Sequence, residues 1–443
     1  MVNPYFWAKI SFMDNPYVVI IFASLLIVFS YIFTQISKWT KIPSVIFLIG
    51  TGVAAQYGVK SMGMEIPDLN QHLSLLGVVG LMMIVLEGAL DIKVHRKKIR
   101  TILAALATSI IILGVTNSLI GGIIYFTGNV SMMDAFFYAI PLSVVSSAIV
   151  IPSVHTLIPK KKEFMILEAT LSDIFGIMLF ELWIIEPHAN QTYFEAITLN
   201  VLITIGASVL ISYLLVYVFL KIKTEIKFFL FLAILALLFS IGEYFHYSAL
   251  VIILVFGLLL NNTHAFFRGA LKKLINQEKV SEIREEFVMI TIESSFLIRT
   301  FFFVVFGLTM NLEGLFNPET IIIAVLVMLV IFFTRALNLK VFIKSTIFPQ
   351  MLIAPRGLVT ILLFQKIVEH YHVIPFSEGV LAWVIIGTNL VMMFGLISSG
   401  SSEDDILRIN ANDGSSEGVE YDGDLSSLDG NDTPNSNEES PVE

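Results

Sequence analysis

The chain has 443 residues, of which 56% are hydrophobic and only 14% are Asp, Glu, Lys or Arg. An average soluble domain has about 25% charged residues, so the composition excludes an ordinary soluble enzyme or binding module. The chain has no Cys, which excludes disulfides, thiolate metal sites and thiol redox chemistry. Apolar runs of about 20 residues recur from the first fifty residues to Ser398, and they are continuous rather than alternating. The pattern predicts an all-α polytopic membrane protein.

The apolar runs predict about thirteen transmembrane helices. In chain order they are expected at residues 17–37, 43–60, 73–91, 100–127, 132–158, 163–186, 196–221, 226–244, 246–262, 286–311, 319–342, 346–371 and 376–398.

Charge alternates along the connections between these helices. Every second connection is basic, and these six connections hold 21 of the 27 Lys and Arg residues, with Arg335 assigned to the last of them. The alternate connections are mostly acidic. By the positive-inside rule, the N-terminus is expected outside the cell membrane and the C-terminus in the cytoplasm.

The end of the chain has a different composition. Residues 401–443 hold 13 Asp and Glu but one Arg, while the rest of the chain has 26 basic and 23 acidic residues. Such a segment has too little apolar surface to fold alone. We therefore predict a transmembrane domain at residues 1–398 and a disordered acidic cytoplasmic tail at 399–443. The tail is expected to be a solvated segment, with binding of a regulator as the alternative.

Two of the expected helices are interrupted by proline pairs. Pro141 and Pro152 flank a serine-containing stretch of the 132–158 helix, and Pro349 and Pro355 flank the matching stretch of the 346–371 helix. Proline removes a backbone hydrogen bond and clashes with the preceding turn. The placement predicts an inverted repeat of helices 1–6 and 8–13 in chain order, with two crossing broken helices. Two proline kinks that serve packing alone are the simpler alternative.

Asp173 is expected near the middle of the membrane, because helical rise places it about 15 Å from Glu163. Without water, such a carboxylate favours its protonated form, whereas a neighbouring hard cation favours the charged form. Proton and monovalent cation would then compete for the same oxygens. Ser172, Ser146 and Ser147 supply neutral oxygens for the cation. The alternative role for Asp173 is that of a structural partner of an arginine.

Other charges within the expected helices need partners. We predict that Glu168 and Arg356 form a structural ion pair, because each is too costly to bury alone. Arg299 could neutralise Asp173 or pair with Glu293 or Glu87, and the sequence leaves these three options open.

These residues resemble the monovalent cation–proton antiporter superfamily, and most closely its sodium/proton exchanger branch. That branch has Glu followed by Asn-Asp in its sixth helix, where this chain has Glu168, Ser172 and Asp173. It also has Arg-Gly in the second crossing helix, matched here by Arg356-Gly357. Ser146-Ser147-Ala148 departs from the usual Thr-Asp-Pro and is more similar to the potassium branch.

The resemblance implies a secondary antiporter for pH homeostasis that exchanges a monovalent cation for a proton. Sodium is the first candidate, lithium and potassium are possible ions, and a potassium/proton antiporter or potassium efflux protein is the alternative. Ser172 adds no second carboxylate, so the resemblance implies electroneutral exchange. It also implies a homodimer, in which helices 1 and 7–10 form the dimer domain and helices 4–6 and 11–13 form a core that slides like an elevator.

Other functional classes fit the sequence less well. An intramembrane aspartyl protease needs two facing aspartates, and Asp173 is the only Asp expected at mid-membrane. An enzyme is therefore a remote alternative. We expect no cofactor beyond the transported ions, no nucleic-acid partner, and contact with membrane lipid.

Overall fold

The computed structural model describes residues 16–61, 69–92, 98–128, 130–154, 157–184, 193–221, 228–244, 249–266, 277–312, 314–342, 348–370 and 378–398. The segment predicted as an acidic tail, 399–443, lies outside this part of the chain.

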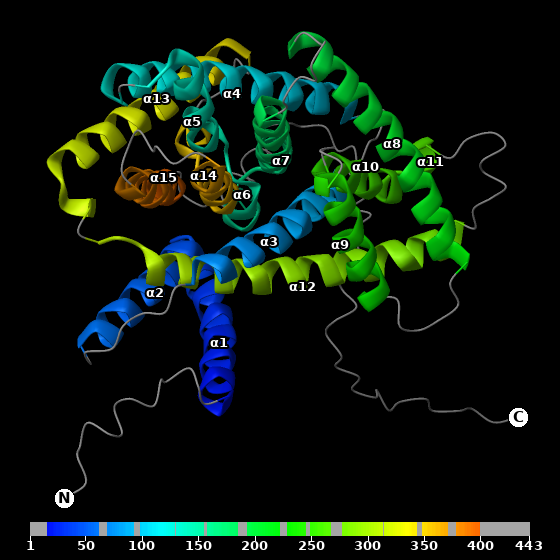
Figure 1. The fold of residues 1–443 in the computed structure, drawn as a ribbon, viewed down its shortest axis with the longest axis horizontal. Helices are drawn as coiled ribbons and strands as arrows, with labels where there is room; N and C mark the ends of the chain where they lie inside the picture. The colour runs from blue at the N-terminus through cyan, green and yellow to red at the C-terminus, as the bar shows by residue number, and fades with distance from the viewer. Residues whose placement is uncertain are drawn as a thin grey trace, which may run out of the picture. The chain divides into compact units, whose positions relative to one another are not determined.

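All regular structure in the described residues is helical (Figure 1). The helices are α1 Pro16–Thr40, α2 Ser44–Ser61, α3 Asn70–Asp91, α4 Ile99–Gly128, α5 Met132–Ser143, α6 Ser147–Ser153, α7 Pro159–Ile184, α8 Tyr193–Lys221, α9 Phe228–Tyr244, α10 Ala249–Asn261, α11 Thr263–Phe266, α12 Gln277–Thr309, η5 Gly314–Phe316, α13 Pro318–Phe342, η6 Gln350–Leu352, α14 Leu358–His370 and α15 Glu378–Ser398.

The all-α fold class is confirmed. The described elements correspond to the thirteen expected helices when α5 with α6, and η6 with α14, are each counted as one broken helix and the short α11 and η5 are set aside. The largest difference is α12, which begins at Gln277 rather than near residue 286. Within the described residues, six helical stretches are long and apolar enough to cross a membrane by length and composition.

The first interruption predicted from the prolines separates α5 from α6 at Val144–Ser146. The prolines themselves lie inside the two short helices, Pro141 in α5 and Pro152 in α6. The unwound residues between them are Val and Ser, whose stiff or competing side chains favour extended backbone over helix. We call residues 144–146 the first break.

The second interruption separates η6 from α14 at residues 353–357. Pro355 within it has no N–H to donate to a helix, and the residue before it is pushed away from the helical region. Helix α14 then begins directly after Gly357. We call residues 353–357 the second break.

Long helices surround the breaks. Helix α4 packs on α5, α7 and α13, and α13 packs on α15 and η6. Below them in the view of Figure 1, α3 runs between the broken helices and α12 and contacts α12, α10 and α14. Both breaks therefore lie in the interior of the helical domain, where Val144, Ile353 and Ala354 are buried.

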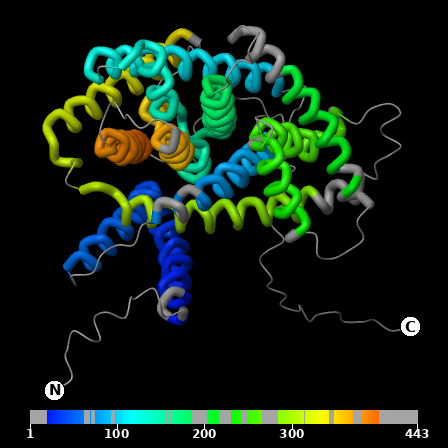
Figure 2. Tube along the Cα trace, viewed as in Figure 1, coloured from blue at the N-terminus to red at the C-terminus, as the bar shows by residue number. Residues whose placement is uncertain are grey.

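Helices α2 and α12 are distant in sequence but lie side by side, as the Cα trace shows (Figure 2). They approach so closely at Gly52 and Gly307 that a Cβ on Gly52 would collide with the Val304 carbonyl, and one on Gly307 with the Ile49 carbonyl. Small residues that let backbones meet are typical of helix contacts in membranes, where apolar burial gives no preference for protein over lipid.

Candidate functional site

The two breaks meet directly. The Ser146 N–H in the first break donates to the Pro355 carbonyl in the second break at 2.9 Å. A Cβ on Gly357 would lie 2.6 Å from the Ser146 hydroxyl oxygen, so a larger residue there would force the Ser146 side chain to shift. The two broken helices therefore meet at their unwound segments.

Asp173, on α7, holds the start of α6. Its Oδ2 accepts from the Ser147 N–H at 2.9 Å and from the Ser147 hydroxyl at 2.5 Å. The residue is 3% exposed, and its Oδ1 has no hydrogen-bond partner. One carboxylate oxygen is thus fixed by the broken helix, and the other is left for a further ligand.

Two further serines lie near Asp173, and only one of them makes a hydrogen bond through its hydroxyl. Ser172, beside Asp173 on α7, accepts from the Val145 N–H at 3.0 Å. The Ser146 hydroxyl is buried and unpartnered. All four residues predicted for the cation site therefore lie around the first break, although Ser172 and Ser147 also have structural contacts there.

Arg356, in the second break, binds the end of α5. Its Nε donates to the Leu142 carbonyl at 2.9 Å and its Nη2 to the Ser143 carbonyl at 3.2 Å, while its Nη1 donates to the Ala354 carbonyl at 2.8 Å. The carbonyl end of a helix carries partial negative charge, which the guanidinium neutralises. This side chain therefore joins the two breaks.

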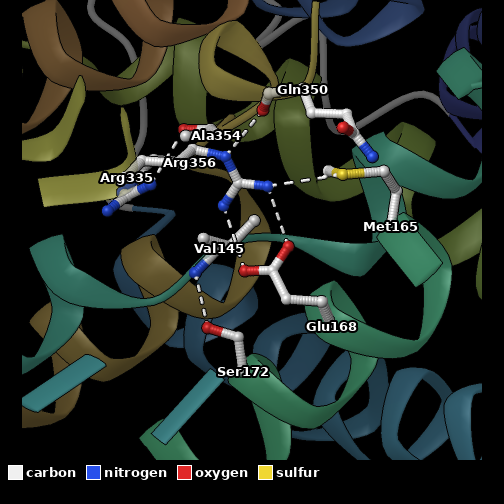
Figure 3. A network of polar contacts seen from close by, with 8 residues as sticks. All are labelled: Val145, Met165, Glu168, Ser172, Arg335, Gln350, Ala354 and Arg356. Atoms are coloured by element: carbon white, nitrogen blue, oxygen red, sulfur yellow. Dashed lines mark hydrogen bonds and ion pairs between the residues drawn. The ribbon is translucent and has the colours of Figure 1, made fainter. Parts of the chain in front are cut away.

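The predicted ion pair between Glu168 and Arg356 is wrong. Both Glu168 oxygens accept from Arg335 on α13, at 3.0 and 2.8 Å, and the pair is fully buried (Figure 3). Arg335 also donates to the Gln350 carbonyl at 2.9 Å and contacts the Met165 sulfur at 3.5 Å. Glu168 thus anchors α7 to α13 and to η6, rather than to the second break itself.

The error came from assigning Arg335 to a cytoplasmic connection. Helix α13 extends to Phe342, so Arg335 lies within it, and the side chain is 1% exposed. The signal was present in the sequence, since residue 335 falls inside the helix expected at 319–342. A buried arginine that keeps its charge requires a carboxylate and further acceptors, and these are what it finds.

Of the three partners considered for Arg299, the structure pairs it with Glu87. Arg299 Nη2 lies 3.5 Å from Glu87 Oε1, and Nη1 donates to the Ala148 carbonyl in α6 at 3.1 Å. Glu293, on the same helix α12, is exposed on the surface of the helical domain. The Arg299 guanidinium therefore links α12 and α3 to the half-helix that follows the first break.

Two residues that hold the second break were missed from the sequence. On α15, the Thr388 hydroxyl accepts from the Arg356 N–H at 3.1 Å, and Asn389 Nδ2 donates to the Arg356 carbonyl at 3.0 Å. Both residues are fully buried. The available signal was an adjacent Thr-Asn pair within an otherwise apolar helix, equivalent in pattern to Ser172-Asp173 on α7.

The site can bind a small hard cation through oxygen. Asp173 Oδ1 is a carboxylate oxygen and Ser146 Oγ is a neutral oxygen, and both are buried without a hydrogen-bond partner. Such oxygens are the ligands that hard cations prefer. The same Oδ1 can instead take a proton, which buried surroundings favour. The arrangement therefore allows one oxygen to serve two competing ligands.

Comparison with known proteins identifies the family and the fold. The family model described as "Sodium/hydrogen exchanger, transmembrane" matches residues 23–402. No curated protein matches the chain. A solved structure of the sodium proton antiporter MjNhaP1 from Methanocaldococcus jannaschii at pH 8 is similar, with a TM-score of 0.63 and 20% identity, covering 86% of this chain and 98% of that one.

An electron-microscopy map of the same archaeal antiporter gives a TM-score of 0.62 at 20% identity, covering 90% of this chain and 99% of the other. At this identity the likeness shows the fold, whereas the family match spans most of the sequence. The chain belongs to the sodium/hydrogen exchanger family and is a multi-pass membrane antiporter of monovalent cations and protons, not an enzyme.

Proposed function

We propose that this antiporter exchanges sodium for protons by competition at Asp173. The observation that carries the proposal is that the two oxygens of this carboxylate differ. Oδ2 accepts hydrogen bonds from Ser147, whereas Oδ1 is buried without a partner. A buried charged oxygen without a partner is costly, so it recruits either a proton or a cation. Binding of one then displaces the other.

Sodium is the first choice among the ions, with lithium and potassium as alternatives. The ligands are a carboxylate and hydroxyls, the hard oxygens that such cations prefer. The Ser146-Ser147 pair in the first break is the feature that favours the potassium alternative, because it is similar to the potassium branch.

Electroneutral exchange follows from the charge count at the site. Asp173 is the carboxylate at the first break, and Ser172 beside it adds none. If one proton and one monovalent cation alternate at one carboxylate, each cycle moves no net charge.

Alternating access is proposed to occur by sliding of a core formed by α4–α7 and α13–α15. The two halves of this core pack alike, since α4 contacts α5 and α7, and α13 contacts η6 and α15. This likeness supports an inverted repeat, which places the ion site at the junction of the halves. The Arg299 contact with Ala148 would then join the core to α12 and would change between states.

Helices α1, α8, α9, α10 and α12 are proposed to form the dimer domain, with the N-terminus outside and the acidic tail in the cytoplasm. Glu293 on α12 supports a protein-covered face there, because it is exposed beside the exposed Met289 and Leu297. A carboxylate facing lipid is costly, and a second copy of the chain would shield it.

The function is tested in proteoliposomes that contain the purified full-length protein and a trapped pH-sensitive dye. Addition of Na⁺, Li⁺ or K⁺ to one side should move protons in the opposite direction, with the largest response to Na⁺. Clamping the membrane potential to different values should leave the rate unchanged. A response to none of the three ions would contradict the proposal, and a rate that follows the potential would contradict electroneutrality.

A further inference from the structure

Thr360, on the first turn of α14, has a buried hydroxyl without a hydrogen-bond partner. The residue is 0% exposed, and Oγ1 accepts and donates no bond. Among the described helices, Thr51, Thr127 and Thr334 bond the carbonyl four residues earlier, whereas the buried hydroxyls of Thr108, Thr170 and Thr291 also have no partner. Such back-bonding is the usual way in which a helical hydroxyl is satisfied.

The two carbonyls within local reach of this hydroxyl belong to the second break. For Thr360 the carbonyl four residues earlier is that of Arg356, and it already accepts from Asn389 Nδ2 at 3.0 Å. The Gly357 carbonyl, three residues earlier, accepts from the Ile361 N–H at 3.2 Å. Each carbonyl has a second lone pair, but neither accepts from Thr360 Oγ1, so the hydroxyl makes no hydrogen bond within the described part of the chain.

The position of Thr360 directs it toward the first break. Leu358 and Leu362 face α3, where they lie against Gly80 and Gly77. Residue 360 lies on the opposite face of α14 by helical periodicity, and α14 also packs on α5 and α7. The Thr360 side chain leans back over the turn that begins at Gly357, and Gly357 is the residue in contact with the unpartnered Ser146 hydroxyl.

We propose that Thr360 is a ligand of the transported cation, contributing a neutral oxygen from the second broken helix opposite Asp173. Ser146 and Thr360 supply free hydroxyl oxygens, and Asp173 supplies the free carboxylate oxygen. The assignment rests on the proposed function, because it requires a cation at Asp173. It gives the second break a part in ion binding.

The test compares Thr360→Val, which removes the hydroxyl with little change in shape, with Thr360→Ser, which restores it. The matched control is Thr108→Val, because Thr108 on α4 is also a buried threonine with an unpartnered hydroxyl. All are assayed for cation-driven proton movement in proteoliposomes across a series of Na⁺ concentrations. Loss of one ligand oxygen should raise the apparent KM for Na⁺ about tenfold while the maximal rate is retained.

Thr360→Ser should return the KM toward the wild-type value, and Thr108→Val should leave it unchanged. As a second readout, Na⁺ binding should raise the unfolding temperature of the protein in detergent. Thr360→Val should need a higher Na⁺ concentration than the wild type for the same rise. If the wild type exchanges ions and Thr360→Val has the wild-type KM, the ligand assignment is overturned and the proposed function stands. If the wild type exchanges none of the ions, both are overturned.

Discussion

The two breaks are held in the same way but by different chemistry. In the first, Ser172 and Asp173 on α7 accept from the Val145 and Ser147 N–H groups. In the second, Thr388 and Asn389 on α15 hold the N–H and carbonyl of Arg356. In each, a hydroxyl residue followed by an Asp or Asn on the next long helix replaces hydrogen bonds that the broken helix has lost.

The difference lies in the charge. The first break is held by a carboxylate that keeps one oxygen free, whereas the second is held by a neutral carboxamide and contains a guanidinium. The guanidinium is committed to carbonyls of α5 and of its own break. We infer that the first break carries an exchangeable charge, on Asp173, and that the second break carries a fixed charge, on Arg356.

The largest expected effect is at the buried pair of Glu168 and Arg335, which joins α7 to α13 and η6. Arg335→Met should lower the free energy of unfolding by about 3–5 kcal/mol, because it leaves Glu168 charged and buried without a partner. Adding Glu168→Gln to it should recover part of the loss. The measurement is thermal or denaturant unfolding of the detergent-solubilised protein.

The control for this pair is the ion pair of Lys98 and Glu163, which are 2.7 Å apart with side chains 48% and 36% exposed. Lys98→Met should cost less than about 1 kcal/mol, because exposed pairs contribute little. If the Arg335 and Glu168 variants lose stability additively when combined, the two residues do not act as a pair.

A smaller effect on the free energy of unfolding is expected at Arg356, the fixed charge of the second break. Arg356→Met leaves the Leu142 and Ser143 carbonyls without this donor and should destabilise the protein by about 1–3 kcal/mol. Arg356→Lys should restore only part of this, since an ammonium cannot reproduce the planar set of donors. If Arg356→Lys were as stable as the wild type, the guanidinium geometry would not matter for joining the breaks.

The smallest of these stability effects tests the contact between the breaks. Gly357→Ala should cost about 1 kcal/mol, because its Cβ would lie 2.6 Å from both Ser146 Oγ and Ile149 Cδ1, which are side-chain ends that must shift. Gly114→Ala on α4 is the matched control, since nothing lies within 4 Å of its Cβ, and it should stabilise the helix by about 0.5–1 kcal/mol. Equal effects of the two changes would contradict a close contact at Gly357.

Much of this fold could be predicted from the sequence. Continuous apolar runs marked the helices, and paired prolines in two of them marked the breaks, because a proline in a helix leaves a clear local signal. The charges at Asp173 and Glu168 identified the region of the site, since burying a charge is too costly without a purpose.

The partners of these charges could not be predicted in the same way. Glu168 has two buried arginines in its surroundings, and the choice of Arg335 over Arg356 depends on how α13 packs beside α7 and η6. The role of Asn389 likewise depends on a backbone carbonyl exposed by the distant second break. Such pairings are long-range contacts, and the spacing of residues within one helix carries no information about them.

The most direct test of ion exchange at the first break compares variants of both breaks in one assay. Proteoliposomes with wild-type protein, Asp173→Asn or Asn389→Ala are given a Na⁺ pulse, and the internal pH is followed. We predict no proton movement for Asp173→Asn, because it has no exchangeable charge. Asn389→Ala should be slower than the wild type but still coupled to Na⁺. Proton movement by folded Asp173→Asn at the wild-type rate, or equal loss in both variants, would contradict the assignment of ion exchange to the first break.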